Sequence, residues 1–274
     1  WGLDETLIIF DSLRDGSFAK SLRKSEAEEA EGAILGQKLQ DLIFALLDGV
    51  FCFRDLEKID FERLENEDKR DDCTVTADEK RHRIETSNPA MKQTSAQCQK
   101  VKQRFEAGQD VLAKLVPTRW LSEREDALAA LERYTQCWLK RSAQALEEMC
   151  EHGAEMTHVL VTDSHVVAAL AKLTFFKISR FFRVENVYSS AHKSKSECFQ
   201  NAISNQATRL HAQSAGEIPE MFAVGNGQGE EEAATAFGIP FVKISSLGDF
   251  EAVHTQFEAL AGIHWKKNPR QGGH

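Results

Sequence analysis

Reactive side chains follow four short apolar runs of the chain. The first run is followed by Asp4, the second by Thr162, and the third by Lys195 at the start of a helical stretch. The fourth is followed by Asn226 within a Gly-Asn-Gly turn, and then by Glu230. A carboxylate can attack an electrophile or move a proton, a hydroxyl or ammonium group can hold an anion, and carboxylate oxygens suit hard cations.

Each of these residues alone is a weak signal of function. Thr162 could cap a helix, Lys195 could be a solvated lysine, and Gly-Asn-Gly is commonly just a turn. Their placement is more informative, because each follows a segment that we expect to be a strand. Ligands of a parallel sheet bind beyond the carboxyl ends of its strands, so these side chains are expected to meet at one edge of the sheet.

The elements that must position them alternate along the second half of the chain. Short apolar runs predict strands at 158–161, 184–188, 221–224 and 241–244. Helical spacing between and after them predicts helices at 166–176, 195–204, 230–237 and 249–261. Strands that alternate with helices predict a parallel sheet covered on both faces.

The first half of the chain has a different texture. Trp1 to Leu3 resemble the end of a buried strand, so we expect most of that strand to precede residue 1. From residue 21 to 153 the spacing is helical, with one apolar stripe over 35–47 and another over 97–115, which Pro117 ends. Ser122 followed by Glu125 predicts a capped helix start.

These two textures together predict an α/β fold with an all-helical insertion after the first strand. The α/β core is expected over 1–20 and 154–264, the insertion over 21–153, and a loose tail over 265–274. Residues 54–72 are rich in acids and are expected to form a solvated loop that continues to about residue 89.

Composition limits the partners. The 274 residues carry 34 Lys and Arg against 43 Asp and Glu, a formal charge of −9, which argues against direct nucleic-acid binding. No apolar run approaches the ~20 residues that span a membrane. The six cysteines and nine histidines show no metal-ligand or disulfide spacing, so we expect a reducing compartment, the cytoplasm or the nucleus.

The order of the motifs resembles the Eyes absent domain, a branch of the haloacid dehalogenase superfamily. The opening Trp-Gly-Leu-Asp-Glu-Thr is similar to the family's W-D-x-D-E-T signature. The other matching segments follow in the family's order, at 12–19, 55–57, 138–146, 160–162, 185–189, 195–199, 225–231 and 240–245.

This resemblance implies a doubly wound parallel sheet of the haloacid-dehalogenase type with a helical cap over 21–153. It also implies an aspartate-based, Mg²⁺-dependent phosphatase, described as acting on phosphotyrosine, within a transcriptional co-activator that binds Six-type homeodomain proteins. By the same resemblance Asp4 would be general acid and base and a metal ligand, Thr162 would hold phosphoryl oxygens, and Lys195 would offset charge. The metal site would take in the positions of Asn226 and Glu230.

The chain departs from the family pattern at two decisive positions. Gly2 stands where the nucleophilic aspartate belongs, and Asn226 stands where a metal-binding aspartate belongs; Gly229 also replaces a usual glutamate. Loss of two carboxylates weakens the attraction for Mg²⁺, so no cofactor is expected unless the site still functions. We therefore expect a catalytically inactive pseudophosphatase, a protein-binding or scaffolding module whose Lys195, lacking carboxylate partners, makes an electropositive cleft.

Two alternatives remain open. The chain could be an active Mg²⁺-dependent protein tyrosine phosphatase and co-activator with a rebuilt site. It could also be a structural subunit of a large assembly, with the helical insertion or the acidic 54–72 segment as its contact surface.

Overall fold

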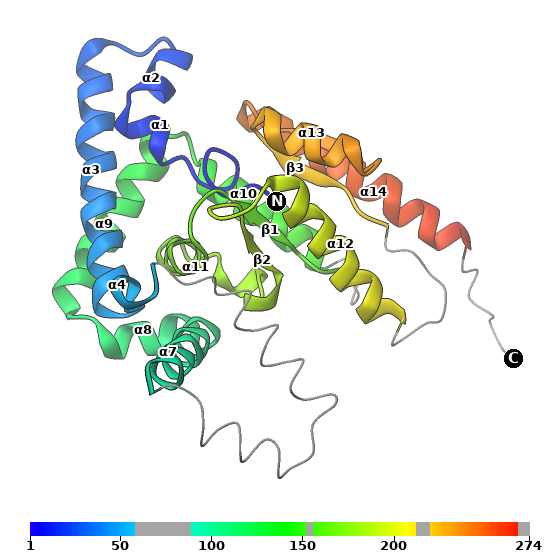
Figure 1. Cartoon of the computed structure of the whole chain (residues 1–274). Helices are drawn as coiled ribbons and strands as arrows, with labels where there is room; N and C mark the ends of the chain where they lie inside the picture. The colour runs from blue at the N-terminus through cyan, green and yellow to red at the C-terminus, as the bar shows by residue number, and fades with distance from the viewer. Residues whose placement is uncertain (58–88, 152–155, 212–219, 268–274) are drawn as a thin grey trace, which may run out of the picture.

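The computed structural model describes residues 1–57, 89–151, 156–211 and 220–267 (Figure 1). Its four strands form two parallel pairs. β1 (Leu160–Thr162) pairs with β2 (Val187–Ser189), and β3 (Ala223–Gly225) pairs with β4 (Phe241–Lys243). The predicted strands are confirmed, and the first three begin later than the apolar runs indicated.

The first two residues connect the two pairs through backbone hydrogen bonds. The Trp1 nitrogen donates to the Val159 oxygen at 2.8 Å, and the Val161 nitrogen donates to the Trp1 oxygen at 2.9 Å. On the other side, the Gly2 nitrogen donates to the Val224 oxygen at 2.8 Å. Residues 1–2 therefore lie between β1 and β3, which gives the spatial order β2, β1, residues 1–2, β3, β4.

Helices cover both faces of these strands. α12 (Lys195–His211) packs against β1 and β2, and α13 (Gln228–Ala236) packs against β3 and β4. Toward the other face, α11 (Val166–Phe175) contacts β2, and α14 (Phe250–Lys267) contacts β4. Consecutive strand residues alternate between two buried clusters, as period-two side chains must; Leu160 belongs to one cluster and Val161 to the other.

The remaining helices precede β1 in the chain. They are α1 (Asp11–Arg14), α2 (Ser17–Ser21), α3 (Glu26–Gly49), α4 (Phe53–Leu56), α7 (Pro89–Glu106), α8 (Gly108–Leu115), α9 (Thr118–Tyr134) and α10 (Trp138–Glu151). Three short 3₁₀ turns follow later, at Ser179–Phe181, Val184–Asn186 and Leu247–Asp249. No helix among the described residues has the length and apolar character needed to cross a membrane.

The predicted apolar stripe over 35–47 is the buried face of α3. This helix begins at a capping box of Ser25 and Glu28, and its Leu39 and Leu46 are completely buried. α3 runs beside α9 and also contacts α11 (Figure 1). One buried cluster extends from α3 to α14, so the helical block and the strands share a hydrophobic core.

Several details of the predicted helices are wrong. α9 begins at Thr118, directly after Pro117, so Ser122 lies inside the helix and does not cap it. The predicted helix over 97–115 is two helices, because the chain turns at Gly108, whose φ is +61°. Residues 54–56 are helical in α4, whereas 58–88 lie outside the described residues. α14 continues to Lys267, beyond the expected start of the tail, and 268–274 also lie outside.

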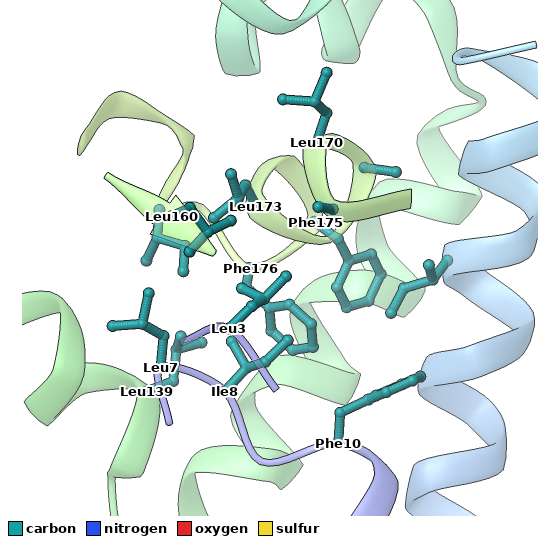
Figure 2. Packing of buried hydrophobic residues seen from close by; sticks show 14 of the residues in the cluster. Leu3, Leu7, Ile8, Phe10, Leu139, Leu160, Leu170, Leu173, Phe175 and Phe176 are labelled. Carbon is teal, nitrogen blue, oxygen red and sulfur yellow. The ribbon is translucent and has the colours of Figure 1, made fainter. Parts of the chain in front are cut away.

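The loop that follows residue 2 is fixed by the core. Leu3, Leu7 and Ile8 are buried and lie toward Leu160 of β1 and Phe176 at the end of α11 (Figure 2). These apolar anchors flank Asp4 on both sides in the sequence, so the packing determines where its carboxylate lies.

Candidate functional site

Gly2 lies at the centre of the strand ends and has no space for a side chain. A Cβ atom at this position would lie 2.9 Å from Thr6 Oγ1 and 3.2 Å from Glu230 Oε1. Thr6 is completely buried and its Oγ1 donates to Asn226 Oδ1 at 3.5 Å. The place where a side chain of residue 2 would begin is thus crowded by neighbouring oxygens.

Asp4 is held in an ion pair that the sequence did not suggest. Its Oδ1 accepts from Lys172 Nζ at 2.7 Å, and its Oδ2 accepts from Ser164 Oγ at 3.1 Å. Lys172 also donates to Ser164 Oγ at 3.1 Å and lies over the Phe10 ring, 4.9 Å from its centroid. Both carboxylate oxygens of Asp4 are therefore bonded to neighbouring side chains, and its charge is balanced by a buried lysine.

The other residues of the opening motif have structural roles. Glu5 adopts a positive φ of 59° and accepts hydrogen bonds from the Phe10 and Ser12 nitrogens, which satisfies the start of α1. Burial raises the pKa of Glu5 above its ordinary 4.5, although these hydrogen bonds act in the opposite direction. The buried Trp138 indole donates to the Thr6 oxygen at 2.9 Å, so it also holds the loop.

Thr162 ends β1 and its hydroxyl is part of a turn. Its Oγ1 accepts from the Ser164 nitrogen at 3.1 Å, and its backbone oxygen accepts from the Ser190 nitrogen at 2.8 Å. Asp163, the residue between them, accepts from Ser190 Oγ at 2.5 Å. The ends of β1 and β2 are thereby joined through polar contacts.

Lys195, the first residue of α12, has two carboxylate partners. Its Nζ lies 2.9 Å from Asp163 Oδ2 and 3.0 Å from Glu230 Oε1. Burial lowers the pKa of Lys195, but hydrogen bonds and attraction from Asp163 and Glu230 outweigh this, so the pKa lies above its ordinary 10.5. The expectation that Lys195 lacks carboxylate partners and makes the cleft electropositive is wrong, because Asp163 and Glu230 both face its ammonium group. The sequence alone does not show that Asp163 reaches Lys195.

Glu230 lies at the end of β3, beside Gly225 and Gly227. It is 7% exposed, and its Oε2 accepts from the Gly227 nitrogen at 2.8 Å, as in a capping box at the start of α13. Its carboxylate also comes within 2.6 Å of where a Cβ of Gly225 would lie, which explains the need for glycine there. Both oxygens of Glu230 are thus bonded, one to Lys195 and one to the backbone.

Three of the predicted residues lie in two separate polar groups. One group joins Asp4 to Lys172 and Ser164, and the other joins Lys195 and Glu230 to Asp163. Asn226 contacts the first loop through Thr6. No contact joins the Asp4 and Lys195 side chains, so the two predicted catalytic residues have separate partners among the described residues.

The donor set at the strand ends does not fit a divalent cation well. The Asp4 and Glu230 carboxylates each face a lysine ammonium group, and Asn226 offers a neutral amide. Within the described part of the chain, no three His, Cys, Asp or Glu side chains group in a way that could hold a metal ion. A hollow elsewhere is lined by residues of α13 and by Lys243, and includes none of the predicted site residues.

Sequence reasoning missed Lys172 and Asp163, the partners that change the electrostatics. Lys172 lies within the apolar helix α11, and a single lysine in such a helix is usually expected at the surface. Its burial beside Asp4 results from tertiary packing. Asp163 directly follows Thr162, and this adjacency to a predicted strand end was the available signal.

Comparisons with curated proteins give relatives over nearly the whole chain. Protein phosphatase EYA2 of Homo sapiens is 28% identical over 279 residues, 94% of this chain and 49% of that protein. Protein phosphatase EYA of Arabidopsis thaliana is 27% identical, over 91% of this chain and 82% of that protein. Protein phosphatase eya of Drosophila melanogaster is also 27% identical, over 94% of this chain.

The chain spans about half the length of the human relatives it matches. No protein-family model matches it. The resemblance inferred from the order of the motifs is nevertheless confirmed by curated relatives from animals and a plant: this chain is related to the Eyes absent protein phosphatases across nearly its whole length.

Proposed function

We propose that this chain is an Eyes absent-like domain that has lost phosphatase turnover and acts as a protein-binding or scaffolding module. Its fold is a haloacid-dehalogenase-like, doubly wound α/β core with the helical block over 21–153 as its cap. The parallel strand pairs covered on both faces, and the relatives named as phosphatases, support the family part of this proposal.

The observation that carries the proposal is the absence of a side chain at residue 2. In the covalent mechanism implied by the resemblance, a carboxylate at this position attacks phosphorus and accepts the phosphoryl group. Gly2 has no side chain and therefore no carboxylate to attack with, and Thr6 and Glu230 crowd the space that such a side chain would enter. Loss of a covalent nucleophile costs on the order of 10⁴–10⁶ in turnover, by analogy with other hydrolases.

Asp4 is a poor replacement nucleophile. It is anchored by Lys172 and Ser164, and an attacking carboxylate must align closely with the phosphorus atom. If the Asp4 carboxylate moved away to attack, the buried Lys172 ammonium group would lose its ion-pair partner, which is energetically costly.

The metal side of the chemistry is weakened as well. Mg²⁺ binds through carboxylate oxygens, and Asp4 and Glu230 already neutralise lysines. Asn226 supplies an amide in place of the second aspartate that the family resemblance implies. The proposal therefore assigns the chain no resident cofactor.

A turnover assay tests the loss of activity. The whole chain is incubated with Mg²⁺ and 4-nitrophenyl phosphate, or a tyrosine-phosphorylated peptide, beside human protein phosphatase EYA2 as the active comparison. We expect no phosphate release above the protein-free blank. Mg²⁺-dependent release that scales with protein concentration and disappears in Asp4→Asn would establish the alternative, a working phosphatase with a rebuilt site.

The binding role is tested separately. We propose protein partners, with Six-type homeodomain proteins as the first candidates by family resemblance, in the cytoplasm or nucleus. Purified chain and a Six-type protein are mixed and examined by size-exclusion chromatography with light scattering. A stable complex supports the module reading, whereas two separate peaks at micromolar concentration count against this partner.

A further inference from the structure

We infer that the Asp163 carboxylate occupies an anion site at Lys195 and Ser190, and that it keeps tetrahedral oxyanions such as inorganic phosphate from binding there. This inference rests on the proposed function, in which the strand ends keep their polar residues without turnover. It concerns which group binds Lys195, and anion binding is measured separately from turnover.

The two carboxylates that face Lys195 differ in how firmly they are held. The Glu230 side chain is 9% exposed and its second oxygen is bonded to the Gly227 nitrogen. The Asp163 side chain is 74% exposed, and its other oxygen accepts a hydrogen bond from the Ser190 hydroxyl. Glu230 is therefore a buried, firmly held partner of Lys195, whereas the exposed Asp163 carboxylate can be replaced without disturbing a buried contact.

Asp163 makes the contacts that an oxyanion would need. One carboxylate oxygen accepts from the Ser190 hydroxyl, and the other lies 2.9 Å from the Lys195 ammonium. Hydroxyl and ammonium donors around a point beyond a strand end are what a phosphate oxygen would use. The carboxylate both occupies these donors and places a negative charge where an anion would approach.

The charges nearby also oppose an anion. The strand ends carry the carboxylates of Asp4, Asp163 and Glu230 against the ammonium groups of Lys172 and Lys195, and these five side chains sum to one net negative charge. Removing the Asp163 carboxylate brings this balance to zero. It also leaves Lys195 with Glu230 as its carboxylate partner and the Ser190 hydroxyl with the Thr162 oxygen, at 3.2 Å, as its acceptor. Glu230 remains, so we expect measurable but modest affinity for a dianion.

The experiment measures binding of inorganic phosphate to the whole chain by ³¹P NMR titration. The variants are Asp163→Ala, which removes the occupant, and Asp163→Asn, which removes only its charge. We expect at least tenfold tighter phosphate binding by Asp163→Ala than by the unmodified chain, with Asp163→Asn between them. Combining Asp163→Ala with Lys195→Met should abolish the gain.

Asp11→Asn is the matched control, because it removes an exposed, ion-paired aspartate at α1. It should bind phosphate no better than the unmodified chain. Equal phosphate affinity in the unmodified chain, Asp163→Ala and Asp163→Asn would overturn the inference, as would a gain that survives Lys195→Met. Turnover of a phosphate ester by the unmodified chain would instead contradict the proposed function. The measured phosphate affinities would still decide whether Asp163 blocks anion binding.

Discussion

Gly2 shows how a single residue sets the chemistry available to this chain. Neighbouring side chains leave little space beside its Cα: Thr6 Oγ1 lies 2.9 Å and Glu230 Oε1 lies 3.2 Å from the position that a Cβ atom would occupy. Glu230 can move its end, but Thr6 is β-branched and completely buried. The steric cost of a side chain at residue 2 therefore arises mainly from Thr6.

This leads to a prediction for a double-mutant cycle. Gly2→Ala should lower the free energy of unfolding by about 1–2 kcal/mol, since extra volume in a packed site forces its neighbours to shift. In a Thr6→Ala background the same substitution should cost clearly less, because the crowding oxygen is gone. Urea unfolding of the four proteins measures the coupling, and additive costs would show that Thr6 does not limit the space.

His158 provides a second prediction at the residue scale. It is buried, its Nδ1 accepts from the Trp1 indole, and its Nε2 lies 3.2 Å from the Leu146 oxygen. Burial lowers its pKa from the ordinary 6.5 to about 4, despite the bond to Leu146. The unfolded chain therefore binds more protons between these values, and stability that is complete above pH 6.5 is lost as the pH falls toward 4.

The measurement compares the chain with His158→Gln, which cannot titrate but can still donate and accept hydrogen bonds. Between pH 7.5 and 4.5 the histidine protein should lose about 2–3 kcal/mol more unfolding free energy than the glutamine variant. Parallel pH profiles for the two proteins would mean that His158 is not held neutral by the fold.

At the scale of elements, α3 offers a matched pair of substitutions. Leu39 is completely buried and Ile34 is 72% exposed on the same helix. Leu39→Ala should lower the free energy of unfolding by ~2–5 kcal/mol, whereas Ile34→Ala should change it by less than ~0.5 kcal/mol. Chemical denaturation gives both values; a similar cost at the two positions would contradict the burial of this helix face.

The elements also show what the sequence could and could not predict. The strands were predicted because they are short apolar runs, and the helices α3, α11 and α12 because their apolar residues repeat with helical spacing. The break between α9 and α10 was not found, because Gln136 and Cys137 adopt positive φ values of 57° and 67° without any glycine to mark them. Such turns depend on tertiary contacts and leave no local signal.

The candidate site was predicted in part for a similar reason. Strand ends gave Asp4, Thr162 and Lys195, and motif order gave the departures at Gly2 and Asn226. The pairing of Asp4 with Lys172 and of Lys195 with Asp163 joins residues on different elements, and no spacing rule connects them. The reactive groups could be predicted from the sequence, whereas their ion-pair partners could be identified only in the structure.

At the scale of the whole molecule, one buried cluster links the helices before β1 to the strands and α14. The loop that carries Asp4 packs into this cluster through Leu3, Leu7 and Ile8 (Figure 2). Because the loop is anchored by the shared core, its position does not depend on any reaction at the strand ends. That separation of fold from activity is the basis of the proposed scaffolding role.

The most direct test of the central claim asks whether any carboxylate of this chain can accept a phosphoryl group. Beryllium fluoride forms a mimic of aspartyl phosphate, and ¹⁹F NMR detects the protein-bound form in the presence of Mg²⁺. We predict only the resonances of free fluoride species with the unmodified chain. A stoichiometric bound resonance that is lost in Asp4→Asn would show that a carboxylate at the strand ends can accept a phosphoryl group and would contradict the account.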